Sequence, residues 1–435
     1  MHLAVVGGGW AGLAAAVEAV AFGHEVTLYE MARRPGGRAR RVDGAEPALD
    51  NGQHILIGAY TETLRLMSLV GADADRLLWR RPLALAFADG AALALPAGAP
   101  RLAFARAVLG CRGWPWRDRW RLLLAAAGWA RDGFRCDDGL TVAELARDLP
   151  ASARADLIEP LCIAALNTPA AQASASVFLR VLHDALFAGR GSADLLLPRV
   201  DLSALWPDAA AHWLAQRGAT LRWGERVMQL EALATGWRVG SASFDGAILA
   251  ASSVEAARLA QDHAPAWTAS ARALRHEPIV TVVLSSAGTR LPQPMLALRH
   301  GGSAPAQFVF DLGQLRGLPG LFAFVISGAG EWVARGLQAT AHATLEQARA
   351  ALAAHAAGPW AEVRSFTEKR ATFLCTPGLA RPPAAIAPRL MAAGDYIAGP
   401  YPATLEGAVR SGIAAVRALD AAFSGARTGP PAARR

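Results

Sequence analysis

The glycine-rich segment at the start of the chain constrains its fold more than any other feature. Residues 3–6 form a short apolar run, and residues 7–12 read G-G-G-W-A-G, which has the spacing G-x-G-x-x-G. We expect a buried strand at 3–6, a helix at 13–22 and a second strand at 25–30. A glycine loop between a strand and a helix is typical of a dinucleotide-binding unit.

Each part of this loop has its own task in such a unit. The first glycine allows the tight turn, the second lets the backbone approach a pyrophosphate, and the third allows the helix to pack closely on the strand. The helix start offers backbone amides to the phosphates, and Glu30 can accept the ribose hydroxyls. A carboxylate there repels a 2′-phosphate, so FAD or NAD is favoured over NADP. The predicted contacts are Gly7, Gly9, Trp10, Ala11, Gly12 and Glu30.

The segment after Glu30 separates FAD from NAD. It continues through Arg33 to Gly36-Gly37-Arg38, which completes the pattern E-x(5)-G-G-R. This extended fingerprint resembles that of the flavin-dependent amine oxidase and carotenoid desaturase superfamily. The resemblance implies FAD as cofactor, with Arg33, Gly37 and Arg38 in its site. It also implies that Arg38 contacts the pyrophosphate, and a planar guanidinium matches phosphate oxygens bidentately.

A second cofactor segment lies near the carboxyl terminus. Residues 389–393 read as a strand ending in Gly394-Asp395, and residues 409–419 have helical composition. In the superfamily that these residues resemble, the Gly-Asp pair binds the ribityl–phosphate stretch and the helix start meets the isoalloxazine, where a helix N-terminus offers partial positive charge. The implied contacts are Gly394, Asp395, Thr404, Leu405, Glu406 and Ala408. Residues 224–230 resemble the superfamily strand whose valine backbone meets the adenine, which adds Val227.

A site built from both ends and the middle of the chain implies two interleaved domains. We expect an α/β fold with a Rossmann-type, glutathione-reductase-like FAD-binding domain interleaved with an α+β substrate domain, as in flavin amine oxidases. The FAD-binding domain is expected at 1–80, 196–255 and 386–424, and the substrate domain at 81–195 and 256–385, with strands at 279–284, 307–311 and 321–326. Residues 425–435 are expected to form a flexible tail.

Four further motifs narrow the resemblance. They are D-N-G-Q-H at 50–54, A-L-N-T-P at 165–169, D-L-L-L-P-R at 194–199 and E-K-R-A-T-F at 368–373. Together they resemble the hydroxysqualene dehydroxylase family of bacterial hopanoid biosynthesis, also called squalene-associated FAD-dependent desaturases. The resemblance implies reductive removal of the hydroxyl of hydroxysqualene, giving squalene, FAD and water.

That reaction needs an acid for the leaving hydroxide, a site that tolerates an allylic cation, and hydride from reduced flavin. His54 is the first candidate for the acid, because an imidazolium donates near neutral pH, and a structural histidine is the alternative. Asn167 can donate to the substrate hydroxyl or merely hold its turn. Lys369 can hydrogen-bond near flavin N5, neutralise Glu368, or lie on the surface.

Two scarcities support these candidates. Of the 44 basic residues, Lys369 is the only lysine, and asparagine occurs only at Asn51 and Asn167. A lysine or asparagine that persists in so arginine-rich a chain is a candidate for chemistry that other residues cannot replace. Asn51, with its neighbours Gly52 and Gln53, is expected at the polar edge of the flavin.

Residues 101–135 combine arginines with Trp114, Trp116, Trp120 and Trp129 around an apolar stripe. This composition suits an interfacial helix at an anionic membrane, and an ordinary amphipathic helix is the alternative. A hydrophobic C30 isoprenoid substrate lives in a bilayer. We therefore expect peripheral association with the inner face of the cytoplasmic membrane.

The charge and the cysteines bound the partners. The net charge is +8 with a pI near 10.1, but the arginines are spread along the chain, which argues against nucleic acid. The four cysteines lie far apart without metal-like spacing, so we expect reduced thiols, no metal and a cytoplasmic location without a signal peptide. An electron donor and other squalene-synthesis enzymes are candidate partners.

Three alternatives remain open. A carotenoid- or phytoene-type desaturase shares the fold and a polyisoprenoid substrate but acts oxidatively. An amine oxidase is less favoured, because a basic chain with 7% aromatic residues gives little sign of an aromatic cage. A non-catalytic flavin scaffold would bind FAD without turnover.

Overall fold

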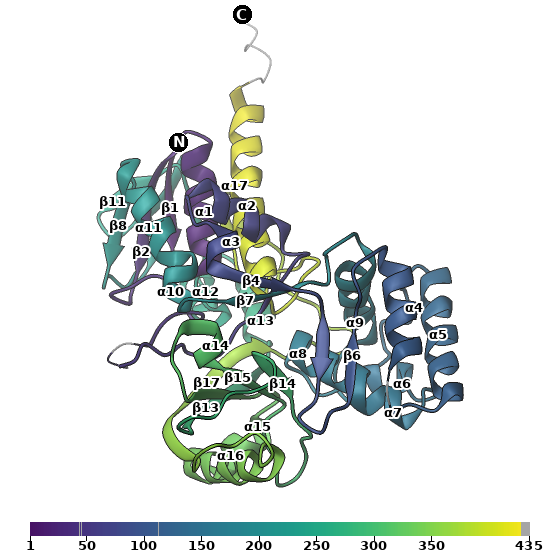
Figure 1. Cartoon of the computed structure of the whole chain (residues 1–435). Coiled ribbons are helices and arrows are strands. Elements are labelled where there is room, and N and C mark those ends of the chain that lie inside the picture. Colours follow the sequence, from purple (N-terminus) through teal and green to yellow (C-terminus); the bar gives the residue numbers. More distant parts are fainter. Residues whose placement is uncertain (43, 45, 112, 428–435) are drawn as a thin grey trace, which may run out of the picture.

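The largest sheet gathers strands from the start, middle and end of the chain (Figure 1). The computed structural model describes residues 1–42, 44, 46–111 and 113–427. The strand order is β18-β19-β12-β1-β2-β8, parallel throughout except for the edge strand β18. The bounds are β1 (His2–Val6), β2 (Glu25–Glu30), β8 (Thr220–Trp223), β12 (Gly246–Leu249), β18 (Ala385–Ala387) and β19 (Leu390–Ala392). The strands β1 and β12 are apolar and buried, as central parallel strands require.

Two helices from opposite ends of the chain pack together on this sheet: α1 (Trp10–Ala21) and α17 (Leu405–Arg427) (Figure 1). Glycine makes both close approaches possible. A Cβ at Gly12 would lie 1.8 Å from the carbonyl oxygen of Gly7, and a Cβ at Gly412 would lie 2.2 Å from that of Ala11. Both helices exceed their expected ranges at the N-terminus, since α1 begins at residue 10 and α17 at residue 405.

The second large sheet has five antiparallel strands in the order β14-β15-β16-β13-β17. Its bounds are β13 (His276–Ser285), β14 (Met295–Ala297), β15 (Phe308–Asp311), β16 (Leu321–Ile326) and β17 (Ala361–Phe373). Alternate residues face opposite sides: Val282 and Phe324 pack in the core beneath α16, whereas Val283 and Ala323 join the main core. The helices of this region are α14 (Leu312–Arg316), α15 (Gly330–Arg335) and α16 (Leu337–Ala351).

A group of helices stands to one side of both sheets (Figure 1). Its members are α4 (Pro100–Gly110), α5 (Trp116–Arg131), α6 (Val142–Leu145), α7 (Ala151–Ala153), the π-helix η1 (Arg154–Ile158), α8 (Glu159–Leu166), α9 (Ala175–Leu182) and the π-helix η2 (His183–Phe187). The single interfacial helix expected at 101–135 is therefore wrong, because the chain turns between α4 and α5. Trp114 lies in that turn, where it is buried and its Nε1 donates to Asp156 at 2.7 Å.

The remaining elements connect these layers. They are β3 (Leu56–Ile57), α2 (Thr61–Leu69), α3 (Ala74–Leu77), β4 (Leu78–Arg81), β5 (Ala84–Ala86), β6 (Ala92–Ala94), β7 (Leu195–Pro198), α10 (Leu202–Leu205), α11 (Pro207–Gln216), β9 (Leu230–Leu233), β10 (Gly236–Val239), β11 (Ala242–Phe244), α12 (Ser253–Ala260) and α13 (Pro265–Arg272). None of the helices in the described part of the chain is long and apolar enough to span a membrane.

Two expected segments differ from the structure. The strand expected at 224–230 is wrong: β8 ends at Trp223, because Gly224 turns the chain with φ +76°, and β9 begins only at Leu230. The tail was expected from residue 425, but α17 continues to Arg427. Residues 428–435 of that tail lie outside the described residues. The division into two domains stays a prediction.

Candidate active site

The glycine loop and the G-G-R segment lie directly against each other. The backbone N–H of Gly36 donates to the carbonyl of Gly8 at 2.8 Å, and Gly9 forms a β-bridge with Gly36. A Cβ on Gly37 would lie 3.0 Å from the Cα of Gly9. A side chain at position 37 would therefore crowd Gly9, and the backbones of the two motifs lie directly against each other.

The N-terminus of α1 opens onto that surface. The helix follows Gly9, and no side chain of the described residues caps it. The first-turn amides of Trp10, Ala11 and Gly12 are therefore available to an anion, which the helix dipole also favours. The indole of Trp10 has a separate, structural role, because its Nε1 donates to the carbonyl of Ala39 at 3.1 Å.

The carboxylate of Glu30 sits at the edge of the glycine loop, and its contact with a ribose stays a prediction. It accepts from the backbone N–H of Gly8 at 2.6 Å and from that of Ala32 at 2.7 Å. These two bonds hold it at the carboxyl end of β2. Arg33, the residue after Ala32, is exposed on the same loop.

Arg38 joins the two cofactor segments. Its Nη2 lies 2.5 Å from Oδ1 of the buried Asp395, and its Nη1 donates to the carbonyls of Ala371 at 2.6 Å and Arg370 at 3.2 Å. The carboxylate of Asp395 raises the pKa of Arg38, which keeps the guanidinium charged. The G-G-R arginine, the Gly-Asp pair and strand β17 thus meet at one point.

Asn51 connects the D-N-G-Q-H motif to the same point. Its Nδ2 donates to the carbonyl of Arg38 at 3.2 Å and to Oε2 of Glu368 at 3.1 Å. Glu368 also accepts from the backbone N–H of Arg370 at 3.2 Å. Neutralisation of Glu368 by Lys369 is therefore wrong: Lys369 is exposed on β17 and has no hydrogen bond or ion pair with any described residue.

His54 does not fit the role of an imidazolium acid. Burial lowers the pKa of His54 to about 4, with the charge of Arg38 acting in the same direction. The ring is therefore neutral near pH 7, and this expectation is contradicted. It lies against Gly52, where a Cβ would come within 3.6 Å of Cε1, and Gly52 itself has φ +95°. Gln53, between them, is half-buried.

Asn167 is also placed in a structural role. It ends α8 in the left-handed conformation with φ +46°, and only 4% of it is exposed. Its Nδ2 donates to the carbonyl of Glu277 at 3.2 Å and to Oγ1 of Thr372 at 3.0 Å, while its Oδ1 accepts from the N–H of Gly328 at 2.7 Å. Both amide hydrogens are used, so the expected donation to substrate is wrong.

Thr404, Leu405 and Ala408 lie at the start of α17 as expected. Thr404 caps the helix, since its Oγ1 accepts from the N–H of Gly407 at 2.9 Å. Leu405 is half-buried beside it, and Ala408 is buried. Contact of this helix start with the isoalloxazine stays a prediction.

Glu406 is not a cofactor contact. It is fully buried and accepts from the backbone N–H groups of Glu62 and Thr63, both at 3.0 Å. Arg410 donates to the same carboxylate at 2.7 Å. Glu406 therefore caps α2 and ties it to α17, and the expectation is wrong because a carboxylate at a helix N-terminus satisfies amides that have no intrahelical partner.

Val227 lies in an extended connection rather than a strand. It is buried, and its carbonyl accepts from Nη2 of Arg258 at 2.8 Å. Nη1 of the same arginine donates to the carbonyl of Met228 at 2.6 Å. A contact from the backbone of Val227 to the adenine stays a prediction. The carbonyl of Val227 already accepts the hydrogen bond from Arg258.

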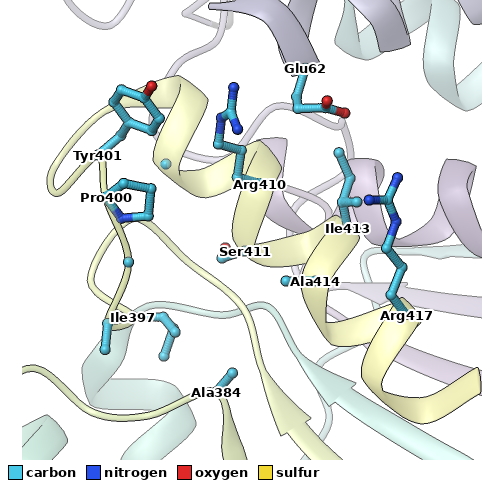
Figure 2. Close-up of a pocket in the computed structure, with 13 residues that line it drawn as sticks. Glu62, Ala384, Ile397, Pro400, Tyr401, Arg410, Ser411, Ile413, Ala414 and Arg417 are labelled. Atoms are coloured by element: carbon cyan, nitrogen blue, oxygen red, sulfur yellow. The ribbon is translucent and has the colours of Figure 1, made fainter. Parts of the chain in front are cut away.

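A cavity of about 310 Å³ lies on the outer face of α17 (Figure 2). Figure 2 shows Arg410 and Arg417 projecting from the helix toward it, with Tyr401 and Glu62 at its rim. The two guanidinium groups are held by Glu406 and Glu18. None of the predicted site residues lines this cavity, which is separate from the glycine loop.

The residues around the loop fit FAD. The Gly9–Gly37 contact leaves a side-chain-free surface, the start of α1 offers amides, and Glu30 and Arg38 supply the carboxylate and guanidinium that a ribose and a diphosphate need. Sequence reasoning missed the backbone carbonyls of 370–371 and the acceptor role of Glu368. The E-K-R-A-T-F motif was the signal for both.

A glycine loop opening a helix, completed by a ribose-type carboxylate and a phosphate-type arginine, defines the class of FAD-dependent oxidoreductases. The family model for flavin containing amine oxidoreductases matches residues 10–420. The chain belongs to this family, and its cofactor is FAD.

The curated relatives confirm the narrower resemblance. Hydroxysqualene dehydroxylase of Rhodopseudomonas palustris is 29% identical, with 94% of this chain and 96% of the relative covered. That of Zymomonas mobilis is 26% identical over the same shares. Zeta-carotene desaturase of Synechocystis is 45% identical, but over 17% of this chain and 15% of the relative.

The solved structures agree on the fold. An oxidoreductase from Methanosarcina mazei superposes with a TM-score of 0.74 at 15% identity, covering 96% of this chain and 100% of that one. Cyclohexylamine oxidase from Brevibacterium oxydans gives 0.71 at 16% identity, covering 97% and 99%. These likenesses show the flavin amine oxidase fold.

Proposed function

We propose that the enzyme reductively removes the hydroxyl of hydroxysqualene to form squalene. The observation that carries this proposal is similarity to hydroxysqualene dehydroxylases along the whole chain, whereas the similarity to zeta-carotene desaturase is confined to one short segment. In the overall balance the carbon–oxygen bond breaks, hydroxide leaves with one proton as water, and a hydride takes its place on carbon. Bound, reduced FAD supplies that hydride and its two electrons.

In this scheme the residues of the chain bind and orient FAD. The α1 amides and Arg38 hold the diphosphate, Glu30 holds the ribose, and Asn51 fixes the loop against Glu368. His54 is neutral and Asn167 is fully bonded, so Lys369 is the remaining proton donor of the three candidates. Its ammonium group has no partner among the described residues that would restrain it.

The decisive experiment is anaerobic photoreduction of the purified flavoprotein followed by addition of hydroxysqualene. Reoxidation of the flavin with one squalene formed per flavin supports the proposal. A flavin that stays reduced refutes it. Oxidised enzyme incubated with phytoene or squalene tests the desaturase alternative, which would instead give a reduced flavin and a more unsaturated product.

The exposed side of α5 supports a location at a membrane surface. Trp116, Trp120 and Leu124 lie one helical turn apart and are 59%, 47% and 68% exposed, and Leu102 of α4 is 61% exposed. Arg117 and Arg121 are exposed beside them. We propose that this face, rather than the buried Trp114, contacts anionic lipid and brings the enzyme to a C30 isoprenoid substrate.

The charges on α5 agree with an anionic surface. Its one acidic residue, Asp118, accepts a hydrogen bond from Oγ of Ser152 at 2.8 Å. Its carboxylate is therefore bonded to a residue of α7. Arg119 donates to the carbonyl of Trp114 at 3.1 Å, which holds the turn between α4 and α5. The exposed cations are therefore left without a neighbouring acid on the same helix face.

A further inference from the structure

A buried ion pair joins the D-N-G-Q-H motif to α14, which follows a strand of the antiparallel sheet. Nη1 of Arg316, the last residue of α14, lies 3.0 Å from Oδ2 of Asp50, the first residue of the motif. Nη2 of the same arginine donates to the carbonyl of Ala48 at 2.7 Å. The side chains of Arg316 and Asp50 are only 6% and 3% exposed. The arginine therefore holds the segment at 48–50 by two contacts that are largely shielded from water.

The other oxygen of Asp50 is also bonded. Its Oδ1 accepts from the backbone N–H of Leu202 at 2.9 Å, in the first turn of α10. Asp201 caps the same helix and pairs with Arg41 at 3.0 Å. A buried ion pair needs such additional hydrogen bonds to offset its loss of hydration. Asp50 therefore fixes α10 and α14 to one loop.

This loop lies alongside the residues that directly follow the G-G-R motif. Arg41 and Asp50 form an antiparallel β-bridge, and the N–H of Asn51 donates to the carbonyl of Arg40 at 2.9 Å. Nδ2 of Asn51 continues the series with its hydrogen bond to the carbonyl of Arg38 at 3.2 Å. Bonded contacts thus connect α14 to the backbone of the G-G-R arginine, across 266 positions of the chain at the ion pair itself.

We propose that Arg316 and Asp50 are positioning residues of the FAD site, which hold the backbone of the G-G-R motif in the geometry that binds the cofactor. The proposal combines the buried ion pair, the two contacts of Arg316 and the hydrogen bonds that lead from Asp50 to the motif. A binding site keeps its geometry only when the residues behind it are themselves fixed by packing and hydrogen bonds. The proposal rests on FAD as the cofactor and is independent of the substrate.

The test measures the Kd for FAD of Arg316→Met in the full-length chain. The holoenzyme is diluted, and the released flavin is followed by its fluorescence. Methionine fills part of the same apolar volume but has no donor, and we expect Kd to rise roughly three- to thirtyfold. The variant should still fold, because burial already raises the pKa of Asp50 to about 7 and its carboxyl can take up a proton once the guanidinium is gone.

Two further variants separate positioning from a general loss of stability. Arg316→Lys should give an intermediate Kd, since an ammonium keeps the charge but cannot contact two acceptors as the planar guanidinium does. Asp50→Asn should also raise Kd, and it keeps an oxygen for the N–H of Leu202. The double variant with Arg316→Met should bind FAD no more weakly than Arg316→Met alone, because both changes remove the same contact.

Arg299→Met is the matched control. Arg299 also contacts two carboxylates from other segments, Asp89 at 2.8 Å and Asp156, but neither belongs to a predicted cofactor segment. Its effect should appear in the melting temperature of the holoenzyme, with Kd for FAD within about twofold of the wild type. A folded Arg316→Met variant with the Kd of the wild type would overturn the proposal, and so would an equal rise of Kd in the control. None of these measurements involves hydroxysqualene, so a failed dehydroxylase assay leaves their result intact.

Discussion

Arg38 and Asp395 form an ion pair of 2.5 Å although 357 positions separate them in the chain. Arg38 follows β2 and Asp395 follows β19, and both strands belong to one parallel sheet. The carboxyl ends of parallel strands lie along the same edge, which is where ligands bind in such sheets. The pair therefore closes the cofactor site across the strands β12 and β1 that lie between.

We expect Arg38→Gln to weaken FAD binding at least tenfold, because a guanidinium that can reach the diphosphate is lost. The FAD-free chain should also lose about 1–3 kcal/mol of unfolding free energy, since the buried carboxyl group of Asp395 loses its hydrogen-bonded partner. Urea unfolding and flavin fluorescence measure the two effects. A variant with normal FAD affinity would exclude Arg38 from the site.

The neutral state of His54 predicts a pH effect on stability. Its pKa is about 4 in the folded chain against an ordinary 6.5, so the unfolded chain binds the proton more readily. The contribution is fully present above pH 6.5 and is lost as the pH falls toward 4, by about 2–3 kcal/mol. Urea unfolding of His54→Gln should show a shallower decline over this window than the wild type. His342→Gln, at an exposed position of α16, is the control and should follow the wild type.

Asn167→Ala should affect folding rather than chemistry. It leaves the N–H of Gly328 and the carbonyl of Glu277 without their partner, which costs about 2–4 kcal/mol. Turnover per flavin-loaded molecule should stay within about threefold of the wild type, since no part of the side chain is free to reach a substrate. A hundredfold loss of turnover in a stable variant would return Asn167 to the catalytic machinery.

Lys369→Arg distinguishes a proton donor from a mere positive charge. Arginine keeps the charge but does not release its proton near neutral pH, so a donor role predicts a loss of turnover of about 10²-fold or more. The FAD content should not change, because Lys369 has no hydrogen bond or ion pair with any described residue. Full turnover in this variant would show that the position requires only a cation.

The face of α5 predicts binding to anionic vesicles. Trp116→Ser combined with Trp120→Ser should abolish flotation with vesicles of phosphatidylcholine and phosphatidylglycerol, because two exposed indoles are removed. The wild type should bind pure phosphatidylcholine more weakly, since the adjacent arginines then lack anionic headgroups. Trp114→Phe should float normally, because Trp114 is buried. Equal flotation of the double variant and the wild type would disprove the role of this face.

Local patterns were enough to predict the nucleotide unit. The strand at 25–30 has the expected bounds, and the glycine spacing correctly predicted where a helix opens next to a strand; in the antiparallel sheet, the strand at 321–326 also has the expected bounds. These features depend on neighbouring residues: apolar runs favour buried strands, and particular backbone angles or close contacts require glycine. The motif order even indicated that the two ends of the chain build one site.

The roles of single polar side chains depended on contacts that the order of residues does not contain. Glu406 lies inside a predicted cofactor motif, yet it caps α2 because folding brings the first turn of that helix to it. Asn167 lies inside a family-specific motif, yet backbone and side-chain groups from distant strands and a turn engage both of its amide hydrogens and its oxygen. The pKa of His54 falls because the folded chain buries the ring and brings Arg38 near it. Motif spacing predicted a dinucleotide-binding unit, and the family resemblance that the motifs carry implied the fold class and FAD, whereas burial and long-range partners decided which polar groups remain free for chemistry.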